Sequence, residues 1–256
     1  MCGRFSITSS GEDIWTLIDL TLPDSLKPSR NIIEADFLKK RWQVAPNDWV
    51  PSILPTGYTK AHWWLLPSWS KLEEFKWRIT GKGEKSFSWA PKKQASHFNS
   101  RIATLTDPSR RYWYKLLDQQ RCLIPANGFV EWSDVEMLQP GEKKRQALFY
   151  LKDQKPFFFA GVFDIAKDDE GRDFPSVNII TTEPNEFLKS LPHHRMPAIL
   201  QPEDVKSWMD SRLGNSDARK LVKTVPTGEM GFHFLGTLIN NARYDIPEVL
   251  EPLADS

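Results

Sequence analysis

The second residue of the chain, Cys2, has the most distinctive chemistry in the sequence. Methionine is normally removed when the next residue is small, and its removal here would leave a terminal amine and a thiol on adjacent carbons. Their pKa values are about 8 and about 8.5, so both groups are partly nucleophilic near neutrality. Such a pair suits an aldehyde, because the amine forms an imine and the thiol then closes a thiazolidine ring. A ring-opened abasic deoxyribose is such an aldehyde. The alternative is that Cys2 is simply a small second residue.

Asn99 and Arg101 form a second feature, because residues two apart on an extended segment point to the same side. The Arg101 guanidinium can hold a phosphate bidentately, and the Asn99 amide can orient a reacting group. Asn-x-Arg also occurs by chance, so this pattern alone assigns no function.

A glutamate within an apolar segment is the third feature. Strand alternation places Glu131 on the same face as Phe129, opposite Val130 and Trp132. Poor solvation would raise the pKa of the Glu131 carboxyl, which could then shuttle protons near neutrality. The alternative is a glutamate on the solvent-facing side of an edge strand.

His193, His194 and Arg195 precede an apolar run and form the fourth feature. Imidazole titrates near neutrality, which suits acid–base catalysis, although a surface turn with a capping histidine is the alternative. Adjacent histidines point to different sides, and no thiol or carboxylate has ligand-like spacing to them. We therefore expect neither a metal nor another cofactor.

Composition narrows the class of protein. The 256 residues are 40% hydrophobic and 26% charged, which is ordinary for a globular protein. No apolar run approaches the roughly 18 residues of a membrane span, and the start is not a signal peptide, so we expect a cytoplasmic, nucleoid-associated protein. Two cysteines, Cys2 and Cys122, exclude a disulfide framework.

Residues 71–115 are basic and aromatic, with eleven Lys or Arg against four Asp or Glu, although the whole chain has a net charge of only +1. Cations meet phosphates and flat rings stack on bases of any sequence, so this stretch suits single-stranded nucleic acid. The alternative is a solvated loop whose aromatic residues belong to the core.

Local patterns predict a mixture of strands and helices. Ser10 to Asp13 reads as the capped start of a helix. Short apolar runs predict the strands 63–67, 121–125, 128–132, 147–151, 157–163 and 177–181, the fourth and fifth of them paired as a hairpin. Helices are predicted over 109–118, 184–190, 202–213 and 216–223. We expect an α+β fold, a single domain over 1–256 around a twisted antiparallel sheet or barrel-like core with peripheral helices, and a mobile insertion near 71–98.

In this order, the motifs resemble the SRAP family, named after "SOS response-associated peptidase", whose members are abasic-site processing proteins. The resemblance covers nearly the whole chain and is carried by residues 1–5, 44–46, 63–69, 99–101, 128–132, 193–200, 240–247 and 251–252. It implies the same single-domain α+β fold.

The resemblance implies a role for each matching residue. Cys2 would form the thiazolidine cross-link, Asn99 would position the terminal amine and the sugar, and Glu131 would shuttle protons. His193 would be the catalytic histidine, because it stands three residues before Met196. Positions matching basic and aromatic DNA contacts are Arg4, Trp63, Trp69, Arg101 and Arg195.

Four positions depart from the family pattern. Gln43 replaces a usual Asn, Trp64 a Gly, Ala103 a Glu, and His194 an acid. The four residues proposed for chemistry are kept, so the departures affect the details of DNA binding more than the reaction.

Three functions remain to be weighed. The first is covalent capture of abasic sites in single-stranded DNA by a monomer that uses no membrane and no metal, with AP lyase cleavage and autoproteolytic release of Met1 as related activities. The second is a cysteine peptidase in which Cys2 attacks an amide with His193 as base. The third is a non-catalytic binder of single-stranded DNA.

Overall fold

The N-terminal strand β1 (Arg4–Ile7) is paired on both edges, with β2 (Arg41–Val44) and with β9 (Gly128–Ser133). In the computed structural model, which describes residues 3–70, 76–79, 85–88, 97–133, 145–168, 170–190 and 194–253, these strands belong to a five-stranded antiparallel sheet. Its order is β15-β10-β9-β1-β2, completed by β10 (Arg145–Leu151) and β15 (Met230–Leu235).

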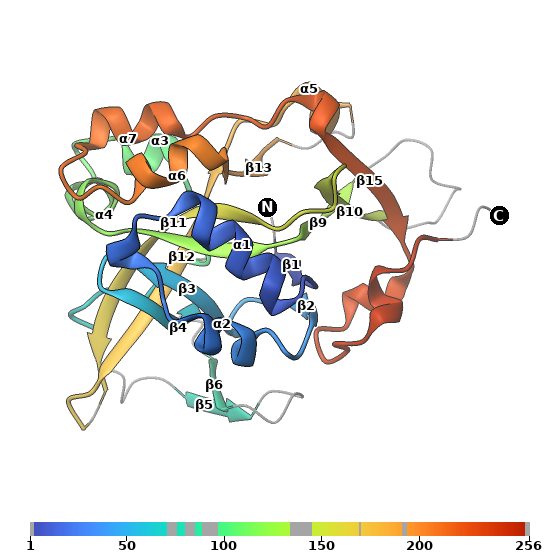
Figure 1. Cartoon of the computed structure of the whole chain (residues 1–256), viewed down its shortest axis with the longest axis horizontal. Coiled ribbons are helices and arrows are strands. Elements are labelled where there is room, and N and C mark those ends of the chain that lie inside the picture. The colour runs from blue at the N-terminus through green and yellow to red at the C-terminus, as the bar shows by residue number, and fades with distance from the viewer. Residues whose placement is uncertain are drawn as a thin grey trace.

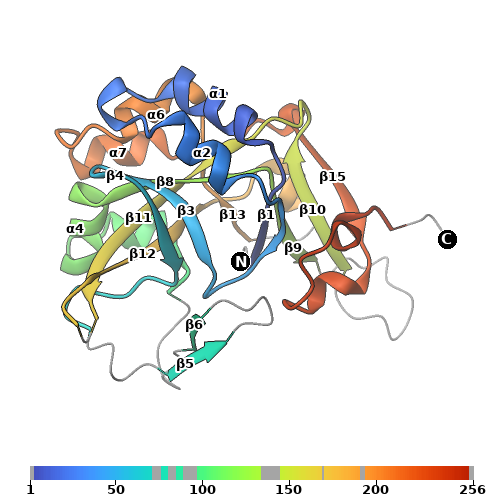
Figure 2. The ribbon, with the colours of Figure 1, turned by 60° about the horizontal axis from the view of Figure 1, so that its bottom comes forward.

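A second, larger sheet faces the first (Figures 1 and 2). Its order is β13-β12-β4-β3-β8-β11-β14, and β7 pairs in parallel with β12. The two longest strands, β11 (Phe157–Lys167) and β12 (Asp173–Thr182), pair antiparallel. The other strands are β3 (Trp49–Leu54), β4 (Gly57–Trp63), β7 (Asn99–Arg101), β8 (Arg121–Ala126), β13 (Met196–Pro197) and β14 (Ile199–Leu200), while β5 (Lys76–Ile79) and β6 (Lys85–Ser88) form a separate pair.

Aromatic side chains fill the space between the two sheets. Phe5 of β1 meets the rings of Trp63 at 4.9 Å and Phe159 at 5.6 Å, which both lie on the second sheet. Phe129 of β9 also contacts Phe159 and stacks on Phe149 of β10. Because large aromatic side chains dominate core energetics, these contacts join the sheets into one barrel-like core.

Helices cover the outside of the core. In Figure 1, α3 (Ile102–Leu105), α4 (Arg111–Gln119), α6 (Pro202–Trp208) and α7 (Asn215–Leu221) gather at one end. The predicted first helix is confirmed as α1 (Gly11–Thr21), and its start has the capping box of Ser10 and Asp13. The remaining helices are α2 (Arg30–Asp36), α5 (Glu186–Lys189) and the short 3-10 turns η1 (Asp24–Leu26), η3 (Thr227–Glu229), η4 (Thr237–Asn240) and η5 (Pro247–Leu250). The predicted α+β class with a barrel-like core is confirmed.

Three local predictions are wrong. Strands 147–151 and 157–163 do not form a hairpin, because β10 pairs with β9 and β15 while β11 pairs with β8, β12 and β14 of the other sheet. β11 is almost continuously buried and β10 is buried over residues 146–149, and each strand has partners on both edges in its own sheet, so neither edge is left for the other strand. The strand expected over 63–67 ends at Trp63, and the helix expected over 202–213 ends at Trp208. Most of the insertion expected near 71–98 lies outside the described residues.

Candidate active site

Glu131 lies on β9, with β1 on one side and β10 on the other. It pairs with Ala147 of β10, and the neighbouring Val130 pairs with Arg4 of β1. The predicted alternation is confirmed, because Phe129 packs in the main core whereas Val130 and Trp132 pack in a separate cluster on the other face. Glu131, on the face of Phe129, is only 2% exposed. Burial raises the pKa of the Glu131 carboxyl to about 7, against the opposing influence of the Arg195 charge. Both protonation states are therefore populated at neutral pH, as a proton shuttle requires.

Asn99 is positioned by parallel pairing of β7 with β12. Asn99 stands opposite Ile179 and Arg101 opposite Thr181, and the Thr181 hydroxyl donates to the Ser100 carbonyl at 3.2 Å. The Asn99 side chain is buried, at 7% exposure, whereas Arg101 is exposed at the end of the strand. The chain thus passes within three residues from the interior to the surface.

Arg101 and Arg195 line a cavity of about 230 Å³ at that surface. Burial and the nearby positive charge of Arg101 lower the pKa of the Arg195 guanidinium, while Glu131 and Glu183 oppose this change. Two guanidiniums that repel each other beside an open cavity are suited to bind a bidentate anion such as a phosphate. The cavity is completed by Ile102, Ala103, Thr181, Thr182, Glu183 and His194.

The Arg195 charge connects this cavity to the buried carboxyl. The positive charge of Arg195 attracts the carboxylates of Glu131 and Glu183 and repels the guanidinium of Arg101, so these groups influence one another electrostatically. An anion bound between Arg101 and Arg195 would offset the Arg195 charge and so raise the pKa of Glu131 further. The site can therefore link anion binding to the protonation of its buried acid.

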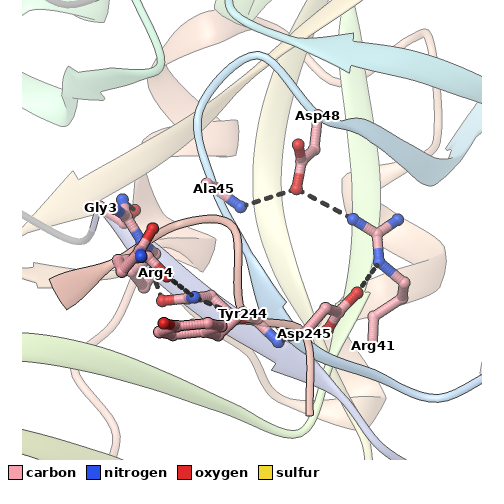
Figure 3. Close-up of polar contacts among 9 residues, drawn as sticks. Gly3, Arg4, Arg41, Ala45, Asp48, Tyr244 and Asp245 are labelled. Carbon is pink, nitrogen blue, oxygen red and sulfur yellow. Dashed lines mark hydrogen bonds and ion pairs between the residues drawn. The ribbon is translucent and has the colours of Figure 1, made fainter. Parts of the chain in front are cut away.

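Arg4 extends from β1 on the face of the sheet that carries Val130 and Trp132, which is opposite the face of Glu131. Its Nε donates to Gln43 Oε1 at 3.2 Å, and its guanidinium carbon lies 5.9 Å from the centre of the Trp132 ring, a cation–π distance. Figure 3 shows Arg4 near Tyr244, which belongs to a C-terminal segment that packs against β2. Sequence reasoning singled out Gln43 only as a departure and Trp132 only as a strand residue. Their contact with Arg4 joins distant parts of the chain.

The two predicted tryptophans lie in different surroundings. Trp63 is fully buried, contacts Phe5 and Phe98, and donates from Nε1 to the Phe98 carbonyl at 2.9 Å. A ring with no exposed surface cannot stack on a base, so the prediction that Trp63 contacts DNA is wrong. Trp69 is 67% exposed and packs edge-on against Tyr112 at 4.6 Å.

Trp69 is distant from the arginine cavity along the sheet. The amide of its neighbour Ser68 donates to Asp164, which pairs with Ser176 of β12, whereas the cavity lies beside Thr181. These two positions lie five residues apart along β12, which corresponds to about 16 Å. If Trp69 meets DNA, it meets a nucleotide several positions away from the one held by the arginines.

Cys2 and His193 lie outside the described residues. The described chain begins at Gly3, one residue before β1, and resumes at His194 beside the arginine cavity. Within the described ranges, no group of three His, Cys, Asp or Glu side chains could hold a metal ion. In the same ranges, no helix has the length and apolar character needed to cross a membrane.

Comparison with known proteins identifies the family and the fold of the chain. The sequence model of the family described as "SOS response associated peptidase (SRAP)" matches residues 1–242. "Abasic site processing protein YoqW" of Bacillus subtilis (strain 168) is 30% identical over 260 residues, covering 98% of this chain and 99% of that protein. "Abasic site processing protein HMCES" of Gallus gallus is 29% identical over 212 residues, covering 75% of this chain and 56% of that protein. A crystal structure of a protein from Bacteroides thetaiotaomicron shares the fold, with a TM-score of 0.72 and 23% identity over 98% of this chain and 100% of that one.

Proposed function

The chain belongs to the SOS response-associated peptidase (SRAP) family, and we propose that it captures abasic sites in single-stranded DNA through a covalent bond to Cys2. The observation that carries the proposal is the buried Glu131 carboxyl, whose pKa is about 7, on the strand paired with the N-terminal strand β1. Relatives named abasic site processing proteins over the whole length of the chain support the same substrate.

The reaction joins an aldehyde and an aminothiol with loss of water. After removal of Met1, the Cys2 amine attacks C1′ of the ring-opened sugar to give a carbinolamine. Glu131 in its acid form protonates the departing hydroxyl, and the imine forms as water leaves. The Cys2 thiol then adds to the imine carbon, and its proton passes to the nitrogen, which closes the thiazolidine ring. Asn99 orients the amine and the sugar, and His193 assists opening of the sugar ring.

Flanking phosphates would be held by arginines around the reacting sugar. Arg101 and Arg195 bind one phosphate in their shared cavity, and Arg4 binds another beside β9. Trp69 offers an exposed ring for a base further along the strand. In this proposal the protein acts as a monomer, with residues 1–256 as a single domain, on DNA at the nucleoid. β-Elimination from the imine is a related lyase activity.

The test uses a single-stranded oligonucleotide with one abasic site, incubated with protein whose mass proves loss of Met1. A denaturing gel is expected to show a shifted band with the unmodified protein and none with Cys2→Ala. Cys2→Ser keeps the amine but lacks the thiol, so its product is expected to survive the gel only after borohydride reduction of the imine. A tetrahydrofuran analogue has no aldehyde and is the matched substrate control.

Absence of a shifted band with correctly processed protein would refute covalent capture. Cleavage of peptide substrates that depends on Cys2, without any DNA adduct, would favour the cysteine peptidase instead. Binding that is equal for intact and abasic DNA and unaffected by Cys2→Ala would favour the non-catalytic binder.

A further inference from the structure

A buried glutamine connects Arg4 to the C-terminal part of the chain. Gln43 has no exposed surface, and its side-chain Nε2 donates to the carbonyl oxygens of Asn241 at 2.9 Å and Tyr244 at 2.6 Å. Its Oε1 accepts from the Arg4 guanidinium at 3.2 Å. One amide thus joins the N-terminal strand to residues 240–245, here called the C-terminal segment.

The two carbonyls determine which way the amide faces. Carbonyl oxygens only accept hydrogen bonds, so the donating NH₂ of Gln43 must face Asn241 and Tyr244. The accepting oxygen then faces Arg4. Without these carbonyls, the amide could turn over and present its NH₂ to the guanidinium, where two donors would repel each other. The orientation that suits Arg4 is therefore imposed by the C-terminal segment.

The same segment supports another group that contacts the Arg4 guanidinium, which also donates from Nη1 to the Gly3 carbonyl at 2.8 Å. Trp132, whose ring lies under that guanidinium, donates from Nε1 to Asn240 Oδ1 at 2.8 Å. Asp245, at the far end of the segment, accepts from the Gln43 backbone amide at 2.8 Å and from Arg41 Nε at 2.9 Å. Both ends of the segment are thereby attached to the sheet around Arg4.

Arg41 anchors the segment firmly. Its second nitrogen donates to Asp48, which is buried and also accepts from the Ala45 backbone amide at 3.0 Å. Figure 3 shows Arg41 between Asp48 and Asp245, with Tyr244 close to Arg4. Charge-assisted hydrogen bonds of this kind, partly shielded from water, fix geometry more strongly than surface ion pairs.

We propose that the C-terminal segment is a positioning element of the DNA site, which acts through Gln43 and Trp132 to hold the Arg4 guanidinium toward a backbone phosphate. This inference rests on the proposed function for the identity of the ligand. Gln43 and Asn240 are positioning residues and do not themselves contact DNA. Their contribution is to limit the motion of a long side chain, which otherwise loses conformational entropy on binding.

A double-mutant cycle tests whether Gln43 acts through Arg4. Binding of fluorescent single-stranded DNA carrying the tetrahydrofuran analogue is measured for the unmodified chain, Arg4→Ala, Gln43→Met and the double variant. Methionine matches glutamine in length and shape, but its thioether is only a weak acceptor for the guanidinium and donates nothing to the two carbonyls. We expect Arg4→Ala to weaken binding about tenfold, as for a lost charge-assisted hydrogen bond, and Gln43→Met to weaken it about threefold. The double variant is expected to equal Arg4→Ala.

The salt dependence adds a readout that a general loss of stability would not change. Loss of one phosphate contact lowers the slope of log affinity against log salt by about 1 in Arg4→Ala, and Gln43→Met is expected to lower it by less. The midpoint of the pH dependence of cross-linking is expected to stay unchanged in Gln43→Met, because Glu131 is intact.

Two further variants serve as control and safeguard. Tyr58→Phe removes one hydrogen bond, from the Tyr58 hydroxyl to Asp36, between β4 and α2 and outside the proposed DNA site, and is expected to leave DNA binding unchanged. Asn240→Ala changes an exposed residue and so keeps the fold, yet removes the acceptor of Trp132. Asn240→Ala is expected to weaken DNA binding about twofold, and this effect is expected to disappear in the Arg4→Ala background.

The outcomes separate this inference from the proposed function. The positioning role is overturned if Gln43→Met weakens binding by the same factor in the unmodified chain and in the Arg4→Ala background. It is also overturned if Asn240→Ala weakens binding equally in both backgrounds. If the cycle behaves as expected but no adduct forms on abasic DNA, covalent capture fails while the positioning role stands. If the unmodified chain does not bind single-stranded DNA at all, both are overturned.

Discussion

Replacing Glu131 by glutamine is expected to stabilise the protein while abolishing its chemistry. The buried carboxyl has a pKa of about 7, against a usual value of 4.5. Each tenfold change in a protonation equilibrium corresponds to 1.36 kcal/mol, so ionisation of Glu131 in the folded protein costs about 3 kcal/mol relative to the unfolded chain. Glutamine keeps the shape of the side chain and avoids this cost.

The sign of the pH dependence follows from which state holds the proton. Between pH 4.5 and about 7 the folded protein keeps a proton on Glu131 that the unfolded chain has released. The contribution of Glu131 to stability therefore declines as the pH rises through this range and is constant above it. Glu131→Gln should match the unmodified protein near pH 4.5 and exceed it by about 3 kcal/mol at pH 8.

Urea unfolding of both proteins at several pH values measures the difference, which isolates Glu131 from other titrating groups. The reasoning is refuted if the difference is the same at pH 5 and pH 8, or if the glutamine variant is the less stable one at pH 8. In the same variant the rate of adduct formation on abasic DNA should fall about 100-fold or more, the usual contribution of a positioned acid or base. The unmodified protein should show a rate that changes with a midpoint near pH 7.

Three further predictions concern the arginine cavity and the two tryptophans. Arg101→Ala and Arg195→Ala should each lower the salt slope of DNA binding by about 1, and only Arg195→Ala should also move the pH midpoint of cross-linking upward, because Arg195 favours the ionised carboxyl. Ala103→Glu should weaken DNA binding measured by anisotropy about tenfold at low salt, because it places a negative charge in the arginine cavity. Trp63→Ala should cost about 3–5 kcal/mol in urea unfolding, whereas Trp69→Ala should change stability by less than about 0.5 kcal/mol and weaken only DNA binding.

The features predicted well from the sequence are those determined by neighbouring residues. Ser10 and Asp13 stand three apart and form the capping box that begins α1. Phe129 and Glu131 alternate with Val130 and Trp132, so one pair enters the core and the other faces the C-terminal segment. Such local rules also identified the acid whose pKa is raised by burial.

The features that were missed depend on pairing across long stretches of sequence. β10 and β11 follow each other in the chain, but β10 pairs with β15, about eighty residues later, rather than with its neighbour. Gln43 bonds to Asp245 across 202 positions. The spacing of residues does not identify such partners. Which strands pair depends on how complete sheet faces are buried in the folded protein. The same limit applies to Trp63. A tryptophan can stack on a base or pack in a core, and the sequence does not distinguish the two, whereas the structure shows that Trp63 is buried.

The two ends of the described chain meet at the site, and this has a consequence for how the site forms. Arg4 begins the first strand, and its supports Gln43 and Trp132 are held by residues 240–245 near the other end. Contacts of such long sequence separation form late, because the entropy of closing the intervening chain must be overcome first. The orientation of Arg4 proposed to face a phosphate therefore depends on completion of the whole fold. A partly folded chain could expose its N-terminal strand, but it would lack the side-chain orientation that selects a DNA backbone beside the reacting sugar. Under the proposed function, the specificity of the N-terminal residues would thus depend on the complete fold and not on the N-terminal sequence alone.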